Sequence, residues 1–223
     1  MTTPALAAAA AERSQHIRQR ADRPSQRRCA EHAGARATVR AALSGVQVRE
    51  SGDAGTLEFV GRASVYEQAY EMWDMFGPYT EVVTEGAGSD SLARADLDVP
   101  LVLGHDQLRR LARTSTGTLF LTESADGLDV RAPALDPADY DVAYIAPKLR
   151  SGLVDEMSFA FRIESGQWSP DYTEYRINRY DIHRGDVAIV GYGANPYTGA
   201  SMRQPAAAPS SRARALLEIA LAR

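Results

Sequence analysis

Short stretches of β-forming sequence, separated by turn residues, fill the chain between about Leu57 and Met202. This spacing is typical of antiparallel sheets. The Asp-Gly step at Asp126–Gly127 lies between two such stretches and indicates a hairpin. We therefore predict an α+β fold, mainly antiparallel β, built as a small barrel or sandwich that carries a few helices. The predicted strands are Leu57–Tyr66, Gly117–Thr122, Leu128–Leu135, Met157–Glu164, Glu174–Ile182 and Val187–Tyr192.

Two stretches of this body have a helical pattern instead. The first is Ser64–Phe76, in which Tyr70, Trp73 and Phe76 recur every three residues. The second is Asp136–Ser151. There Asp136 precedes Pro137 as an N-cap, and Gly152 stands at the expected stop.

Composition divides the chain into three parts. Residues 1–50 form a basic leader rich in Ala and Arg, which we expect to be helical or disordered and to add little to a core. Residues 51–203 are acidic and form the predicted main folded domain. Residues 204–223 combine a Pro/Ala/Ser linker, Gln204–Ser211, with a short amphipathic helix at Arg212–Arg223. The basic leader is either a solvated segment or one that docks on an acidic partner or on nucleic acid.

Several classes of protein are disfavoured by what the sequence lacks. The single cysteine, Cys29, allows neither an internal disulfide framework nor a cysteine-rich metal site. No apolar run is long enough to cross a membrane, and the first residues do not resemble a secretion signal. A glycine-rich phosphate loop is absent, as are basic patches interleaved with aromatic residues. We therefore expect no membrane partner, no specific nucleic-acid partner and no cofactor.

Three residues stand where hydrolytic chemistry could use them. His105 lies at the end of the apolar strand predicted over Val99–Asp106, and an unperturbed imidazole is suited to proton transfer at neutral pH. Ser158 alternates with Met157 and Phe159 on a predicted strand, so its hydroxyl lies on the face opposite to the core side chains. Asp186 opens the next apolar strand, where its carboxylate could orient a histidine. Each of these residues, taken alone, also fits an ordinary surface or turn position.

A metal site is the rival interpretation. His105, Asp106, His183 and Asp186 could supply mixed nitrogen and oxygen ligands to a divalent ion. The sequence has no His-Glu-x-x-His motif that would support this interpretation.

Taken together, these residues resemble the tailed-phage prohead protease family, whose fold is similar to that of the herpesvirus assemblin proteases. The likeness extends from about Gly61 to Met202, and its blocks follow one another in the family's order. These blocks are Phe76–Val83 with Glu85–Ala87, Val102–Asp106, Ser115–Leu119 with Asp126–Leu128, Gly152–Phe161, and Asp186–Val190 with Ala194–Pro196.

The resemblance implies a serine endopeptidase on a small assemblin-like β-barrel. It implies Ser158 as nucleophile, His105 as its base and Asp186 as the third member. His183 is the alternative third member, because assemblins use a second histidine there. Two residues depart from the family's usual pattern. Ala160 stands where glycine is more common, and Asp186 stands where glutamate is more common.

The implied substrates are the major capsid protein, its scaffold region and the protease itself, cleaved in the host cytoplasm inside the assembling procapsid. The likeness to assemblins also suggests a homodimer. Two alternatives stay open at this point. One is a non-catalytic scaffold or capsid-binding module of the same fold, and the other is a metal-dependent hydrolase.

Overall fold

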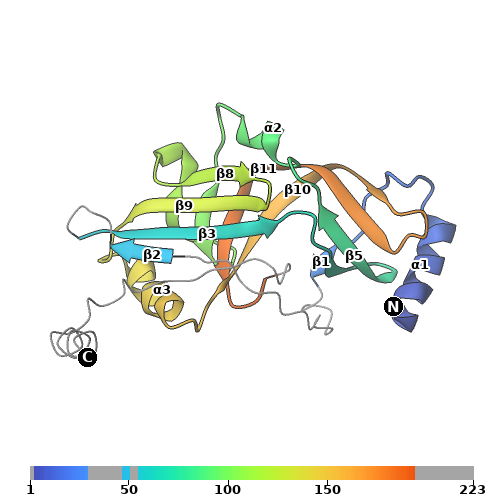
Figure 1. Ribbon diagram of the computed structural model, residues 1–223, viewed down its shortest axis with the longest axis horizontal. Coiled ribbons are helices and arrows are strands. Elements are labelled where there is room, and N and C mark those ends of the chain that lie inside the picture. Colours follow the sequence, from blue (N-terminus) through green and yellow to red (C-terminus); the bar gives the residue numbers. More distant parts are fainter. Residues whose placement is uncertain (1–2, 30–46, 51–54, 194–223) are drawn as a thin grey trace, which may run out of the picture.

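The structure, a computed structural model, describes residues 3–29, 47–50 and 55–193 (Figure 1). The predicted linker and helix at 204–223, and much of the leader, lie outside the described residues. The elements, in chain order, are α1 (Pro4–His16), β1 (Arg28–Cys29), β2 (Gln47–Glu50), β3 (Leu57–Val65), β4 (Tyr70–Asp74), β5 (Gly77–Val83), α2 (Ser89–Leu92), β6 (Pro100–Leu103), β7 (Asp106–Arg113), η2 (Thr114–Thr116), β8 (Phe120–Ser124), β9 (Gly127–Leu135), α3 (Tyr140–Arg150), β10 (Glu156–Trp168) and β11 (Glu174–Val190).

The described strands form two sheets. The larger has the order β1-β4-β5-β11-β6-β7, and β10 pairs with β11 off this path; the smaller has the order β2-β3-β9-β8. Strand β11 is the centre of the larger sheet. It is antiparallel to β10, and it is parallel to β5 near its start and to β6 near its end. The prediction of an α+β fold dominated by antiparallel strands is confirmed. A closed barrel is not found among these strands, so that part stays unconfirmed.

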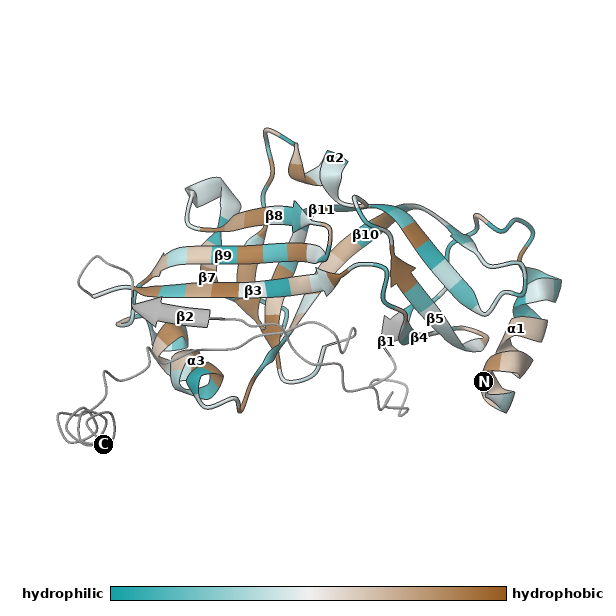
Figure 2. Cartoon of the chain, in the orientation of Figure 1, coloured by the Kyte–Doolittle hydropathy of each residue, from teal (hydrophilic) through white to brown (hydrophobic). Residues whose placement is uncertain are grey.

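The core lies between the two sheets. Strand β3 buries every second residue from Leu57 to Ala63, and the same alternation is visible as brown and teal bands on β3 and β9 in Figure 2. Phe59 and Val130 of the smaller sheet belong to one apolar cluster with Met157 and Ile189 of the larger sheet. The predicted hairpin at Asp126–Gly127 is confirmed, since it joins β8 to β9.

The helix predicted over Ser64–Phe76 is wrong. Strand β3 continues to Val65, and Tyr70–Asp74 is strand β4, which pairs with β5 in an antiparallel hairpin. Burial along β4 has a period of two, with Tyr70 and Met72 inside and Trp73 only partly covered. Aromatic and β-branched residues favour strands when a partner strand is available. Here β5 supplies that partner and overrides the three-residue spacing.

The helix predicted over Asp136–Ser151 exists but begins later. Its N-cap is Asp139, whose carboxylate accepts hydrogen bonds from the backbone N–H groups of Asp141 and Val142. Asp136 instead closes a turn, in which its carboxylate accepts from the Ala138 N–H at 2.8 Å. The predicted stop is confirmed, because Gly152 follows the helix with φ +69°.

Two strand predictions also need correction. Strand β8 begins at Phe120 and not at Gly117, because Thr114–Thr116 forms a 3-10 turn that ends on Gly117. The strands predicted over Glu174–Ile182 and Val187–Tyr192 are one continuous strand, β11. The Gly185–Asp186 step lies inside this strand, next to a shift in the β10–β11 register between Ala160 and Arg162.

The first part of the leader packs onto the larger sheet, which corrects the expectation that it adds little to a core. Helix α1 buries Ala9, Ala10 and the whole Arg13 side chain. The Arg13 guanidinium binds both carboxylate oxygens of Asp74, at 2.8 and 3.0 Å, and donates to the carbonyls of Gly77 and Pro78.

None of the helices in the described part of the chain has both the length and the apolar character needed to span a bilayer.

The Arg13–Asp74 pair should be a main support of α1. We expect Arg13→Met to lower the free energy of unfolding by about 3–5 kcal/mol, because it leaves a buried carboxylate without its cation. Arg18→Met changes an exposed arginine just beyond the helix and should cost less than about 0.5 kcal/mol. Urea denaturation of both variants measures the difference, and equal losses would contradict this role.

Candidate functional site

His105 lies in the tight turn between β6 and β7. Leu103 pairs with Asp106, and the two residues between them, Gly104 and His105, have φ of +60° and +61°. Two positive φ angles define a type I′ hairpin turn, which suits the twist of antiparallel strands. A non-glycine residue is uncommon in this left-handed region, and it is found there mostly where surrounding structure holds it. The turn therefore fixes the backbone from which the imidazole projects.

The imidazole is hydrogen-bonded to Asp186. His105 Nδ1 lies 2.6 Å from Asp186 Oδ1, although 81 residues separate them in sequence. The Asp186 side chain is 3% exposed and that of His105 is 39% exposed, so the ring lies between the interior and the solvent. The other carboxylate oxygen, Oδ2, accepts from Gln107 Nε2, also at 2.6 Å. Both oxygens of this buried carboxylate are thus hydrogen-bonded.

Ser158 lies on the strand beside Asp186. In the β10–β11 pairing, Ser158 is opposite Ala188 and Ala160 is opposite Asp186. In the β11–β6 pairing, Ala188 is beside Val102. Residues paired across neighbouring strands project from the same face of a sheet, and so do residues two apart on one strand. Ser158 and Asp186 therefore share one face.

The two faces of this part of the sheet differ in what they pack against. Met157, Val187 and Ile189 join the main core. Val102, Ala188 and Val190 form a separate small cluster on the face that carries Ser158. The predicted division of β10, with Met157 towards the core and Ser158 away from it, is confirmed. The second face is lined by small side chains next to the serine.

The register brings the ring of His105 back towards Ser158. The Gly104 N–H donates to the Ile189 carbonyl, so the turn begins level with that residue. To reach Asp186, the ring must extend back along β11 past Ala188, which is the residue opposite Ser158. Diagonal neighbours such as Ser158 and Asp186 are about 7–8 Å apart. Within the described ranges no hydrogen bond joins Ser158 Oγ to the ring, and in resting enzymes this contact is often longer than in the reacting complex.

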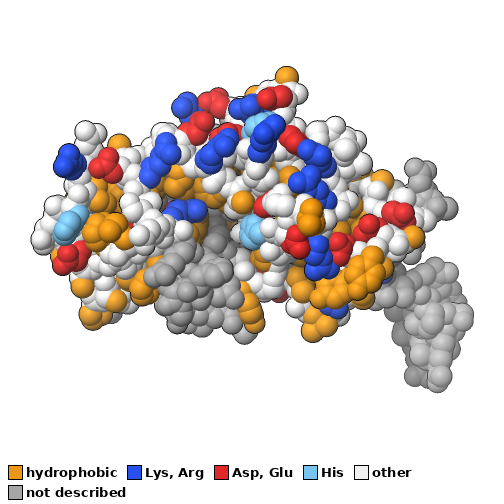
Figure 3. Space-filling model, turned by 180° about the vertical axis from the view of Figure 1, so that it is seen from behind, with side chains coloured by type: hydrophobic (Ala, Val, Ile, Leu, Met, Phe, Trp, Pro, Cys, Tyr) orange, Lys and Arg blue, Asp and Glu red, His pale blue; other side chains and the backbone are white. Residues whose placement is uncertain are grey.

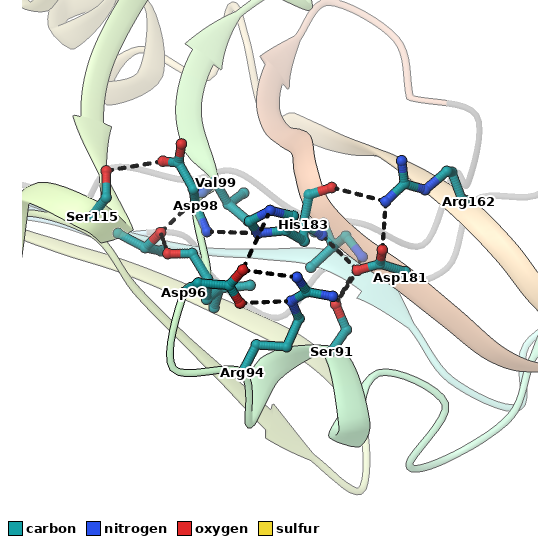
Figure 4. A network of polar contacts seen from close by, with 12 residues as sticks. Ser91, Arg94, Asp96, Asp98, Val99, Ser115, Arg162, Asp181 and His183 are labelled. Atoms are coloured by element: carbon teal, nitrogen blue, oxygen red, sulfur yellow. Dashed lines mark hydrogen bonds and ion pairs between the residues drawn. The ribbon is translucent and has the colours of Figure 1, made fainter.

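His183 belongs to a different network, which Figure 4 shows from close by. Its Nδ1 accepts from the backbone N–H of Asp98 at 3.2 Å, and its Nε2 lies 4.0 Å from a carboxylate oxygen of Asp96. The structure therefore joins His105 to Asp186, and it joins His183 to the segment that precedes β6. Of the two candidates for third member, only Asp186 contacts His105.

The carboxylates around His183 are held in their ionised form. The hydrogen bonds from Arg113 are the main reason why the pKa of Asp98 is lowered to about 2. Burial alone would raise the pKa of Asp181, but hydrogen bonds from Arg162 and Ser91 together lower it to about 2. The network holds the residues of β11 that precede Asp186 against the segment that leads into β6.

The four residues considered as metal ligands do not gather. His105 and Asp186 are together, whereas Asp106 accepts from the Leu108 N–H within its own turn and His183 lies in the network above. In the part of the chain that the structure describes, no group of three His, Cys, Asp or Glu side chains has the arrangement of a metal site. Histidine side chains do reach the surface on the face shown in Figure 3, among basic and acidic neighbours.

One contributor to the site was missed from the sequence. Gln107 contacts the carboxylate of Asp186 as directly as His105 does. The sequence carried no local signal for this contact, because Gln107 reaches Asp186 through the irregular pairing of β6 with β7.

Comparison with known proteins now identifies the chain's relatives. A sequence model of the family described as Caudovirus prohead serine protease matches residues 44–211, which is most of the chain. The chain belongs to this family. It is therefore a serine peptidase, a hydrolase of peptide bonds, that acts in capsid maturation within the assembling phage capsid in the host cell. No curated protein and no solved structure matches it.

At Gly185, the backbone of β11 in this protease lies unusually close to the backbone of β10. A Cβ built on Gly185 would lie 1.8 Å from the Ala160 carbonyl oxygen. The neighbouring Arg184 has φ +60°, and its N–H donates to the Asp98 carbonyl at 2.9 Å. Only glycine allows this approach between the strand that carries Ser158 and the residue before Asp186.

We expect Gly185→Ala to force β10 and β11 apart at this point. The free energy of unfolding should fall by about 3 kcal/mol or more, because backbone atoms cannot move aside as a side chain can. Gly191→Ala is the matched control, since its added Cβ would have no atom within 4 Å. Urea denaturation compares the two, and a Gly185→Ala protein as stable as the control would contradict the close packing.

Proposed function

We propose that Ser158, His105 and Asp186 are the catalytic triad of this protease. The observation that carries the proposal is the 2.6 Å hydrogen bond between His105 Nδ1 and Asp186, formed on the sheet face that also bears Ser158. The roles follow from the chemistry of each group. A serine hydroxyl needs a base, and a histidine base needs a partner that fixes its tautomer.

The tautomer of His105 follows from its partner. An ionised carboxylate only accepts hydrogen bonds, so Nδ1 carries the proton of the neutral ring and Nε2 keeps its lone pair. Ser158 Oγ then attacks the scissile carbonyl carbon while Nε2 takes its proton. The same proton passes to the leaving amine when the peptide bond breaks. Asp186 stabilises the imidazolium that exists between these two transfers.

The two departures from the family's usual residues bear on this geometry. The shorter acid, Asp186, already lies 2.6 Å from His105, so the missing methylene does not prevent the contact. Ala160 lies on the same face as Ser158 and opposite Asp186, so its methyl group narrows the space beside the nucleophile. Ala188, opposite Ser158, is also small and leaves space beside the hydroxyl.

The substrates that we propose are capsid-assembly proteins, namely the scaffold region of the major capsid protein and the protease itself. The family supports capsid proteins as a class. Self-cleavage in Gln204–Ser211 is supported by the composition of that segment, since segments rich in small and polar residues are preferred sites of proteolysis. A homodimer stays a prediction, as do the boundaries at residues 50 and 203.

Replacing the nucleophile or the base should abolish processing. We expect wild type to shorten both itself and a major capsid protein that carries its scaffold region, and Ser158→Ala and His105→Ala to leave both substrates intact. Removal of either member of a triad typically costs several orders of magnitude in kcat. Intact-mass measurement of the products after co-expression is the readout.

Ser165→Ala supplies the control, because Ser165 is an exposed serine further along the same strand. Trimming that persists in both Ser158→Ala and His105→Ala would contradict the triad. A wild type that processes nothing but assembles with capsid subunits would favour the non-catalytic module. Activity that chelation removes and Ser158→Ala retains would favour the metal-dependent hydrolase.

A second comparison separates the two candidates for the third member. Asp186→Asn should lower kcat by about 10³–10⁴, because the amide can hold the ring in the wrong tautomer. His183→Gln keeps an oxygen that can accept from the Asp98 N–H, and it should change kcat by less than about tenfold. Single-turnover processing of the capsid substrate measures both rates. The reverse order would assign the role to His183.

A further inference from the structure

Asp186 is held by two partners, and the mechanism above uses only one of them. His105 Nδ1 occupies Oδ1, and Gln107 Nε2 donates to Oδ2 at 2.6 Å. The carboxylate is almost fully buried, so water cannot readily replace either donor. A carboxylate with one free oxygen could rotate about its last bond. A carboxylate bound at both oxygens is fixed in orientation.

The amide of Gln107 is itself oriented. Arg110 Nη2 donates to Gln107 Oε1 at 3.5 Å, and Arg110 Nε donates to the Gln107 backbone carbonyl at 2.7 Å. A guanidinium only donates and a carboxylate only accepts. The amide must therefore direct its oxygen towards Arg110 and its nitrogen towards Asp186, because the flipped orientation would oppose like groups on both sides.

An irregularity in β7 brings Gln107 to this place. On β6, Val102 and Leu103 are consecutive, yet their partners on β7 are Arg110 and Asp106. The three residues 107–109 therefore form a bulge beside the turn that carries His105. Bulges of this kind re-aim side chains next to active sites. His105 and Gln107 thus reach the same carboxylate from one short segment.

We propose that Gln107 is a positioning residue of the catalytic site, which holds Asp186 so that its other oxygen faces His105. The inference rests on the proposed triad. Gln107 as a whole is exposed, and Leu108 beside it is 93% exposed, so the bulge contributes little to the core. The contribution of Gln107 therefore comes from its bond to Asp186 and not from apolar packing.

Several charged groups nearby have partners of their own. Arg109 is bound to Asp141 at 2.6 Å, and Arg162 is bound to Asp181 at 2.6 Å. On β10, Glu156 accepts from the Gly193 N–H, and on β11 the Arg184 backbone is held by Asp98. The titratable and charged side chains on the segments next to Asp186, namely residues 105–110, 156–162 and 181–185, are His105, Asp106, Arg109, Arg110, Glu156, Arg162, Asp181, His183 and Arg184.

The test uses the pH dependence of serine reactivity in the full-length protein. A fluorophosphonate probe labels an activated serine: Oγ bonds to phosphorus, fluoride leaves, and the base takes the hydroxyl proton. The rate of labelling at Ser158 is measured from pH 5 to 9 for wild type, Gln107→Met, Gln107→Glu and the exposed-site control Gln167→Met. Ser158→Ala shows which labelling belongs to the nucleophile, and thermal unfolding reports stability.

We expect Gln107→Met to label at least about tenfold more slowly at pH 6.5, with its acidic midpoint raised by about one pH unit. A carboxylate that has lost a donor holds the His105 proton more tightly, so the ring becomes a free base only at higher pH. Gln107→Glu has the size of glutamine and adds a negative charge, so its midpoint should rise further. Gln167→Met should match wild type.

The outcomes distinguish the role of Gln107 from the triad itself. Labelling of wild type at Ser158, with rates and midpoints of both Gln107 variants unchanged, would overturn the positioning role and leave the triad in place. A lower unfolding temperature with an unchanged midpoint would also overturn it, since that is what a purely structural residue would show. Failure of the wild type to label at Ser158 would overturn the triad, and the role of Gln107 with it.

Discussion

The register of strand β11 is the constraint on which the site depends. Its last residues are hydrogen-bonded on both edges, to β10 on one side and to β6 on the other, without interruption from Val187 to Ile189. Because side chains alternate between faces, a slip of one residue would turn Asp186 into the core and Val187 out of it. The apolar side chains of Val187 and Ile189 resist such a slip, since both are buried in the main cluster. The core thus fixes the face on which the acid lies.

Burying a carboxylate in this position is costly unless its oxygens are satisfied, and an unpaired buried ion is destabilising by several kcal/mol. The fold meets this requirement with one short segment, the turn and bulge from Gly104 to Arg110. Its type I′ turn projects His105, its bulge projects Gln107, and both reach Asp186. The donors that make burial tolerable are therefore the groups that orient the acid. The same two hydrogen bonds thus stabilise the buried Asp186 and fix the orientation of His105.

Local patterns in the sequence predicted the individual parts better than their assembly. The alternation of Met157, Ser158 and Phe159 was sufficient to place the serine away from the core, and the Asp126–Gly127 step was sufficient for a hairpin. Contacts between residues far apart in the sequence were harder to predict. Nothing local distinguishes Asp186 from His183 as a partner of His105, because the choice depends on the bend at Gly185, where β11 approaches the Ala160 carbonyl. The helix wrongly expected at Tyr70 failed for the same reason, since its partner strand β5 was not visible in a local pattern.

Helix α1 extends this dependence beyond the residues that match the family. It precedes the matched range, yet Arg13 binds Asp74 at the end of β4 and the carbonyls of Gly77 and Pro78 at the start of β5. Its guanidinium also lies over the rings of Tyr79 and Trp168. Strand β5 pairs with the start of β11, and Trp168 ends β10. The helix therefore braces the end of the two strands that lies farthest from Ser158 and Asp186. Strands β10 and β11 are thus held at one end by α1 and at the other by the bond from His105 to Asp186, so the pair has little freedom to change register. We infer that the N-terminal extension supports the site through the strands and without contact with the reacting groups.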